Sequence, residues 1–159
     1  MIKLKIISVG KIKEKSLSIL IDEYIKRLRR YAKIEIVEIN DIAVPDNPSQ
    51  NDILSVITKE GKEILKYLSP KAYVISLCIE GKNVSSEEFA NIIERIHNQS
   101  SEVVCIIGSS HGLSEEIKKL SHFKLSMSEM TFPHNIAKLM LVEQVYRAFK
   151  INNNENYHK

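Results

Sequence analysis

The chain has 159 residues, of which 43% are hydrophobic and 27% charged, and its net charge is +3. This composition excludes a disordered or fibrous protein, and no apolar run approaches the roughly 18 residues that a membrane span requires. The length predicts one domain over residues 1–159. Lysines interrupt the apolar N-terminus and no Cys/His spacing indicates zinc, so we expect a cytoplasmic protein with no metal and no membrane contact.

Strand and helix patterns alternate along the first half of the chain. Residues 2–9 alternate as a strand, residues 14–31 repeat as an amphipathic helix, and residues 33–39 alternate again. Residues 40–50 contain two prolines and several Asn and Asp, which predicts a loop. A helix over about 51–68 follows, with a predicted buried stripe of Ile53, Leu54, Ile57, Ile64, Leu65 and Leu68.

The second half continues this alternation. Ser85 and Glu88 form a capping box for one helix, and Ser114 caps a shorter one. Strands that alternate with helices predict an α/β fold with a mostly parallel sheet and helices on both faces. The further predicted strands are 72–79, 103–107 and 123–127.

The last predicted helix is apolar on most of its sides. It begins at Pro133, a favourable first helical residue, and runs to about residue 150. A helix of this kind must be covered on most sides, so we predict that it packs against another subunit. Its strongly polar residues between 136 and 149 are Lys138, Glu143, Gln144 and Arg147.

Ligands of parallel α/β sheets bind beyond the carboxyl ends of the strands, which directs attention to residues 79–82, 108–112 and 127–134. The glycines of segment 108–112 (GSSHG) permit close approach of a ligand. A tight strand-to-helix turn explains these glycines at least as well.

Segment 127–135 (MSEMTFPHN) offers hydroxyls, thioethers and an aromatic ring that suit a purine-bearing ligand. Composition alone favours a different interpretation, in which Met127, Met130 and Phe132 pack in the core and Thr131 caps the helix. Both interpretations stay open at this point.

Positive charge is concentrated in the first 33 residues, which contain ten Lys and Arg but only three acidic residues. The rest of the chain carries a net charge of −4. Such a surface suits a polyanion, because contacts to phosphates release counterions. Cations at the end of the helix over 14–31 also favour its dipole. Charge alone therefore supports nucleic-acid binding and a solvated helix face about equally.

The motifs MTFPH, LVEQVYRAFKI and a terminal YHK resemble the bacterial ribosomal RNA large-subunit methyltransferase H family of the SPOUT class. Further similarity lies in SVGKIKEK, EYIKRLRRY, the KEG of residues 59–61 and EGKNVSSEEFA, so the resemblance covers essentially the whole chain. It implies a deep trefoil knot, a homodimer through the knot and the last helix, and bound S-adenosylmethionine. The implied reaction is methylation of N3 of a pseudouridine in 23S rRNA within the ribosome.

By position, the resemblance also implies which residues form the site. The implied cofactor contacts are Leu77, Gly108, Met127, Ser128, Glu129, Met130, Thr131 and Phe132. Removal of the N3 proton needs a base, and our candidates are His134, Tyr157 and His158, the last two reaching the cofactor of the partner subunit. The expected RNA contacts are Lys11, Lys13, Lys15, Arg27, Arg30, Lys138 and Arg147.

Three features depart from the family pattern, one of which is a stretch over residues 152–156 that is richer in Asn than is typical. Ser109 stands where a second glycine is usual, and a positive φ there would strain the serine by about 1 kcal/mol. Lys138 stands where an arginine is usual, and lysine lacks the bidentate fork that holds phosphates.

Two other functions share these features. An RNA-binding protein without methyl transfer needs the basic surface but no pocket at residues 127–132, so S-adenosylmethionine binding separates it from an enzyme. A SPOUT methyltransferase that acts on transfer RNA shares the pocket, and only its substrate distinguishes it.

Overall fold

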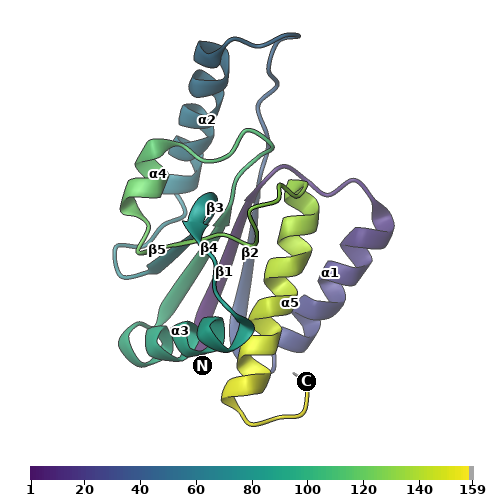
Figure 1. The fold of residues 1–159 in the computed structure, drawn as a ribbon, viewed down its shortest axis with the longest axis vertical. Coiled ribbons are helices and arrows are strands. Elements are labelled where there is room, and N and C mark those ends of the chain that lie inside the picture. The colour runs from purple at the N-terminus through teal and green to yellow at the C-terminus, as the bar shows by residue number, and fades with distance from the viewer. Residues whose placement is uncertain (158–159) are drawn as a thin grey trace.

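The computed structural model describes residues 1–157, in which five strands form one parallel sheet in the order β2-β1-β4-β3-β5 (Figure 1). Ile6 in the middle of β1 lies opposite Ile36 of β2 and Cys105 of β4. The strands are β1 (Ile2–Val9), β2 (Ala32–Ile39), β3 (Tyr73–Lys82), β4 (Glu102–Ile107) and β5 (Phe123–Leu125). The helices are α1 (Lys15–Leu28), α2 (Gln50–Leu65), α3 (Ser86–Gln99), α4 (Glu115–Leu120) and α5 (His134–Asn152). The predicted α/β class with a parallel sheet is confirmed.

Helices cover both faces of the sheet, because successive side chains of a strand point to opposite sides. Leu4 and Ile6 of β1 pack in one hydrophobic cluster with α1, α3 and α5. Ile7 and Val9 pack in a second cluster with α2 and α4 on the other face. Figure 1 shows α2 and α4 on one side of the strands and α1, α3 and α5 on the other.

The caps at Ser85 and Ser114 begin α3 and α4 as predicted. Pro133 is the residue before α5 rather than its first helical residue. A capping box that we did not predict begins α2, where Ser49 Oγ accepts from the backbone N–H of Asp52 at 3.1 Å. The backbone N–H of Ser49 donates to Asp52 in return, at 2.9 Å.

The predicted buried stripe of α2 is wrong at Leu54, which is 53% exposed. The buried face of the helix runs through Val56, Glu60, Gly61 and Ile64 instead. A pattern of apolar residues misses this face, because a glutamate and a glycine occupy the two positions in its centre.

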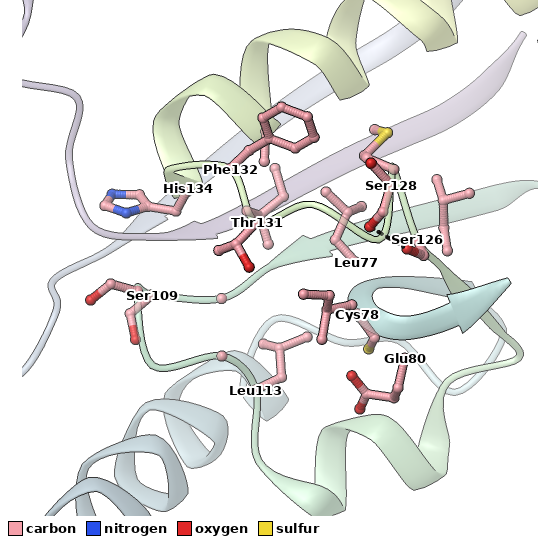
Figure 2. A pocket seen from close by; sticks show the side chains of 18 of the residues that line it. Leu77, Cys78, Glu80, Ser109, Leu113, Ser126, Ser128, Thr131, Phe132 and His134 are labelled. Atoms are coloured by element: carbon pink, nitrogen blue, oxygen red, sulfur yellow. Dashed lines mark hydrogen bonds between the residues drawn. The ribbon is translucent and has the colours of Figure 1, made fainter. Parts of the chain in front are cut away.

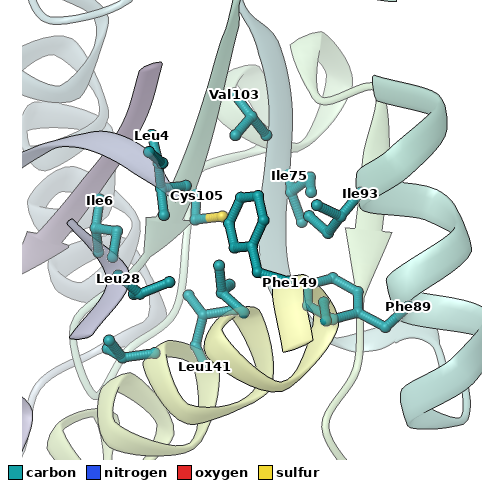
Figure 3. Packing of buried hydrophobic residues seen from close by; sticks show 14 of the residues in the cluster. Leu4, Ile6, Leu28, Ile75, Phe89, Ile93, Val103, Cys105, Leu141 and Phe149 are labelled. Atoms are coloured by element: carbon teal, nitrogen blue, oxygen red, sulfur yellow. The ribbon is translucent and has the colours of Figure 1, made fainter. Parts of the chain in front are cut away.

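One side of α5 is buried within its own chain. The helix lies on the sheet between α1 and α3, and the Phe149 ring lies near Cys105 of β4 and Ile75 of β3 (Figure 3). Ile136 is exposed, whereas Leu139 packs half-buried against the core. A single chain therefore supplies more of the cover of α5 than we expected, and the apolar side chain of Ile136 remains exposed. No helix within residues 1–157 is long and apolar enough to cross a membrane.

Candidate functional site

A cavity of about 390 Å³ lies at the carboxyl edge of the sheet (Figure 2). The end of β3, the loop after β4 and the segment after β5 form its walls, and α5 begins at its rim. Figure 2 shows Ser109 and Leu113 of the loop after β4 across the space from Thr131 and Leu77. This is the edge at which parallel sheets bind ligands, as the sequence predicted.

The loop after β4 turns tightly beside the cavity. Gly112 has a φ of +89°, and its N–H donates to the carbonyl of Ser109 at 2.9 Å. An added Cβ at Gly108 would lie 2.6 Å from the carbonyl oxygen of Gly112, so the backbone at Gly108 packs directly against the backbone at Gly112. Ser109 itself has no positive φ, so the conditional strain at this position does not arise.

Hydrogen bonds fix the segment after β5. Ser126 donates its N–H to the carbonyl of Lys82 at 3.0 Å and its hydroxyl to the carbonyl of Ser128 at 3.0 Å. Ser128 Oγ accepts from the N–H of Met130, also at 3.0 Å. These bonds turn the chain so that the side chains of residues 126–128 line the cavity.

The interpretation of this segment as packing is wrong for two of its residues. Met130 is 73% exposed, and Thr131 is exposed and does not cap α5, which begins without a side-chain cap at Pro133. Met127 does pack at the edge of the core. Exposed groups beside a cavity are available to a ligand, which favours the binding interpretation.

The structure brings seven of the eight expected cofactor contacts together around this cavity. The exception is Glu129, which is exposed and does not line it. The seven are Leu77, Gly108, Met127, Ser128, Met130, Thr131 and Phe132. Whether these residues hold the cofactor stays a prediction.

His134 lines the same cavity from the first turn of α5. Its imidazole lies against Gly10, where an added Cβ would be 3.1 Å from Nε2. The Asn135 side chain donates to Glu14 at 3.1 Å and ties the start of α5 to the segment before α1. Gly10, with a φ of +95°, thus gives room to His134 in a conformation that other residues rarely adopt.

Substituting Gly10→Ala should lower the free energy of unfolding by about 1–2 kcal/mol, because an L-residue is strained at this φ. The new methyl group also displaces the imidazole of His134. Urea denaturation followed by circular dichroism measures the loss. An unchanged midpoint would contradict the conformation described for Gly10.

Tyr157 does not line the cavity. Its hydroxyl donates to Glu143 at 3.1 Å, and the Arg147 guanidinium lies 4.7 Å from the centre of its ring. Burial, with hydrogen bonding to Tyr24 and Glu143, raises the pKa of Tyr157. Glu143 is nine residues along α5 from His134, or roughly 14 Å. The candidate bases are therefore not brought together in one chain, and His158 lies outside the described residues.

The expected RNA contacts fall into two groups. Lys11, Lys13 and Lys15 are exposed between β1 and the start of α1, at the same edge of the sheet as the cavity. The second group lies at the far end of α1 and along α5. There Arg27 and Arg147 pair with Glu23 and Glu143, and Arg30 lies 5.8 Å from the centre of the Tyr31 ring.

Lys138 is wrong as an RNA contact. It is 4% exposed, its Nζ donates to Ser8 Oγ at 3.1 Å, and Glu38 Oε2 lies 3.8 Å away. Burial lowers the pKa of this lysine. A cation enclosed between α5 and the sheet cannot reach a phosphate, and it joins α5 to β1 instead.

Sequence reasoning did not single out Cys78 of β3 or Lys118 of α4 as cavity residues, whereas Glu80 lies in the strand-end region of residues 79–82 that it did select. Cys78 and Glu80 both line the cavity, and β3 continues to Lys82, beyond its predicted end at residue 79. Lys118 of α4 pairs with Glu80 at 2.6 Å, which lowers the pKa of that carboxyl group and raises the pKa of Lys118. An apolar strand pattern gives no signal for an ion pair between two elements.

The reactivity of the Cys78 thiol can be used to probe the cavity, because Cys78 lines it. Burial raises its pKa to about 11, so at pH 8 about one thiol in a thousand is ionised. Alkylation by iodoacetamide should therefore be slow at pH 8 and rise about ten-fold per pH unit towards pH 10. Mass spectrometry of the labelled peptide measures the rate. A rate at pH 8 equal to that of an exposed cysteine in a short peptide contradicts this expectation.

A parallel α/β sheet with a cavity of this size at its carboxyl edge is typical of proteins that bind a small organic ligand. Residues 2–158 match the family described as predicted SPOUT methyltransferase. The chain therefore belongs to the SPOUT methyltransferase family.

Its relatives include proteins named ribosomal RNA large subunit methyltransferase H. The one from Clostridium novyi (strain NT) is 50% identical over 155 residues, which cover 97% of this chain and 98% of the relative. The one from Bacillus thuringiensis (strain Al Hakam) is 50% identical over 157 residues, which cover 98% and 99%. A third, from Clostridium botulinum (strain Langeland / NCTC 10281 / Type F), is 48% identical over 157 residues with the same coverage.

Proposed function

We propose that the protein is an S-adenosylmethionine-dependent methyltransferase that methylates N3 of a pseudouridine in 23S rRNA, on the assembled ribosome and in the cytoplasm. The observation that carries this proposal is the cavity at the sheet edge, which seven of the eight expected cofactor contacts line. Relatives about 50% identical, named as large-subunit rRNA methyltransferases, support the substrate class.

The cavity fits the proposed cofactor in size and chemistry. Its volume of about 390 Å³ lies in the range of small-molecule sites. Leu77, Leu113 and Phe132 offer apolar walls for a purine, and the hydroxyls of Ser128 and Thr131 offer hydrogen bonds. S-adenosylmethionine, when bound, supplies an activated methyl group.

The residues of the chain would act by alignment and by proton transfer. Holding the acceptor nitrogen in line with the methyl group removes much of the entropic barrier. The imide proton at N3 needs an acceptor, and His134 is the candidate that lines the cavity of its own chain. The raised pKa of Tyr157 keeps its hydroxyl protonated while it donates to Glu143, so Tyr157 must leave Glu143 and lose that proton before it can act as a base.

The proposal includes a homodimer through the knot and α5, with residues 1–159 of each chain as one domain. The exposed apolar side chain of Ile136 supports a second subunit at α5. Such a partner would place its residues Tyr157 and His158 at the cavity. RNA phosphates would then meet Lys11, Lys13 and Lys15 beside the cavity and Arg27, Arg30 and Arg147 farther along the surface.

Calorimetric titration with S-adenosylmethionine tests the proposal against an RNA-binding protein without methyl transfer. We expect saturable binding, a raised melting temperature and slower alkylation of Cys78 in the presence of the ligand. Absence of binding by both calorimetry and thermal shift would exclude the enzyme and favour the RNA-binding alternative.

A further inference from the structure

Glu60 is buried in α2, although glutamate is almost never fully buried. It is 3% exposed, and within residues 1–157 it forms no ion pair. Burial of a carboxyl group is unfavourable unless hydrogen bonds replace the lost water. The bonds of Glu60 therefore indicate what the residue does.

Each carboxyl oxygen of Glu60 accepts a hydrogen bond from a different loop. Ser109 Oγ donates to Oε1 at 3.0 Å, and the backbone N–H of Ile42 donates to Oε2 at 3.1 Å. Ser109 belongs to the turn that lines the cavity, and Ile42 belongs to the loop between β2 and α2. Glu60 itself does not line the cavity, so it reaches the site through Ser109.

The neighbouring Gly61 lies directly against Ser114, at the other end of the same loop. An added Cβ at Gly61 would overlap Ser114 Oγ and lie 3.2 Å from Ser114 Cβ. Ser114 caps α4 through the N–H of Ile117. Two successive residues of α2 thus hold the cavity loop, Glu60 at Ser109 and Gly61 at Ser114.

We propose that Glu60 is a positioning residue for the cofactor, which holds residues 108–114 in the shape that binds S-adenosylmethionine. This inference rests on the proposed function. The hydroxyl of Ser109, the residue that departs from the family pattern, is the group through which Glu60 acts. Glu60 touches no reacting atom, so its loss weakens cofactor binding and leaves turnover at saturation within about two-fold of the wild type.

Calorimetry and steady-state methylation of Glu60 variants test the proposal. Glu60→Ala should raise the Kd and KM for S-adenosylmethionine on the order of ten-fold, because it removes both bonds of the carboxyl group. Glu60→Gln should stay within about three-fold of the wild type, since its amide can accept from Ile42 and donate to the Ser109 hydroxyl. Glu63→Ala, on an exposed position of the same helix, is the matched control.

Ser109→Ala separates the link from a general loss of structure. It should weaken cofactor binding several-fold in the wild type and have no further effect in Glu60→Ala, because the two groups form one bond. If Glu60→Ala does not fold, Ser109→Ala alone decides the question.

The outcomes are distinguishable. Wild-type affinity in Ser109→Ala, equal affinity of Glu60→Ala and wild type, or a fall in turnover with no change in Kd overturns the role of Glu60. A wild-type protein that binds no S-adenosylmethionine overturns the proposed function together with this inference.

Discussion

Deleting residues 157–159 is expected to abolish methyl transfer while it leaves the affinity for S-adenosylmethionine nearly unchanged. Tyr157 contacts Glu143 and Arg147 and does not line the cavity of its own chain, so its loss removes no wall of that cavity. In the proposed dimer, Tyr157 and His158 act at the cavity of the partner subunit. Binding and transfer therefore respond differently to this deletion.

Transfer assays and calorimetry on the same truncated protein measure the two effects. Tyr157→Phe separates the hydroxyl, a candidate proton acceptor, from the rest of the tail, because it keeps the ring against Tyr146 and Arg147 and removes only that hydroxyl. If the truncated protein methylates at the wild-type rate, the role of the tail is excluded. If its cofactor affinity falls with its activity, the tail is part of the binding site instead.

Gly108→Ala is expected to raise the Kd for S-adenosylmethionine by roughly 100-fold, about 2.7 kcal/mol of binding energy. An added Cβ would meet the carbonyl oxygen of Gly112 at 2.6 Å and its carbonyl carbon at 2.8 Å. Backbone cannot move aside as a side chain can, so the turn of residues 108–112 must open. Overpacking of this kind also lowers the free energy of unfolding by about 1–3 kcal/mol.

Gly112→Ala is the matched control for that substitution. A Cβ at Gly112 would have no heavy atom within 4 Å, so this variant carries only the strain of its φ of +89°. We expect a cost of about 1 kcal/mol in unfolding free energy and a much smaller change in Kd. Thermal shift and calorimetry on the pair separate the steric effect from the conformational one. Equal Kd values in the two variants contradict the close backbone contact at Gly108.

Hydrophobic periodicity predicted the order and class of the elements because it reports which side chains face the core. It failed where a polar residue lies in that core. The centre of the buried face of α2 is Glu60 and Gly61, and the apolar pattern assigned Leu54 to that face instead. Lys138 failed for a related reason, since position in a helix does not show that Ser8 and Glu38 enclose its ammonium group.

The site was predictable to the extent that strand ends determine it. The loop after β4 and the segment after β5 do meet at one cavity, as the parallel topology requires. Cys78 was missed because an apolar strand pattern does not show which of its residues border a cavity. The pattern also ended the strand at residue 79, whereas β3 runs on past a shift in its register with β5, between Leu77 and Lys82. The contact of Tyr157 with Glu143 depends on the chain folding back after α5, which no local pattern records.

Transfer of labelled methyl groups from S-adenosylmethionine to ribosomes that lack the native methylation tests the central claim most directly. Intact ribosomes, free 23S rRNA and bulk transfer RNA are offered in parallel, and the products are analysed by nucleoside mass spectrometry. The proposed function predicts a pseudouridine methylated at N3 in the 23S rRNA of the intact ribosomes. Label in transfer RNA alone, or no label in any sample despite cofactor binding, would contradict it.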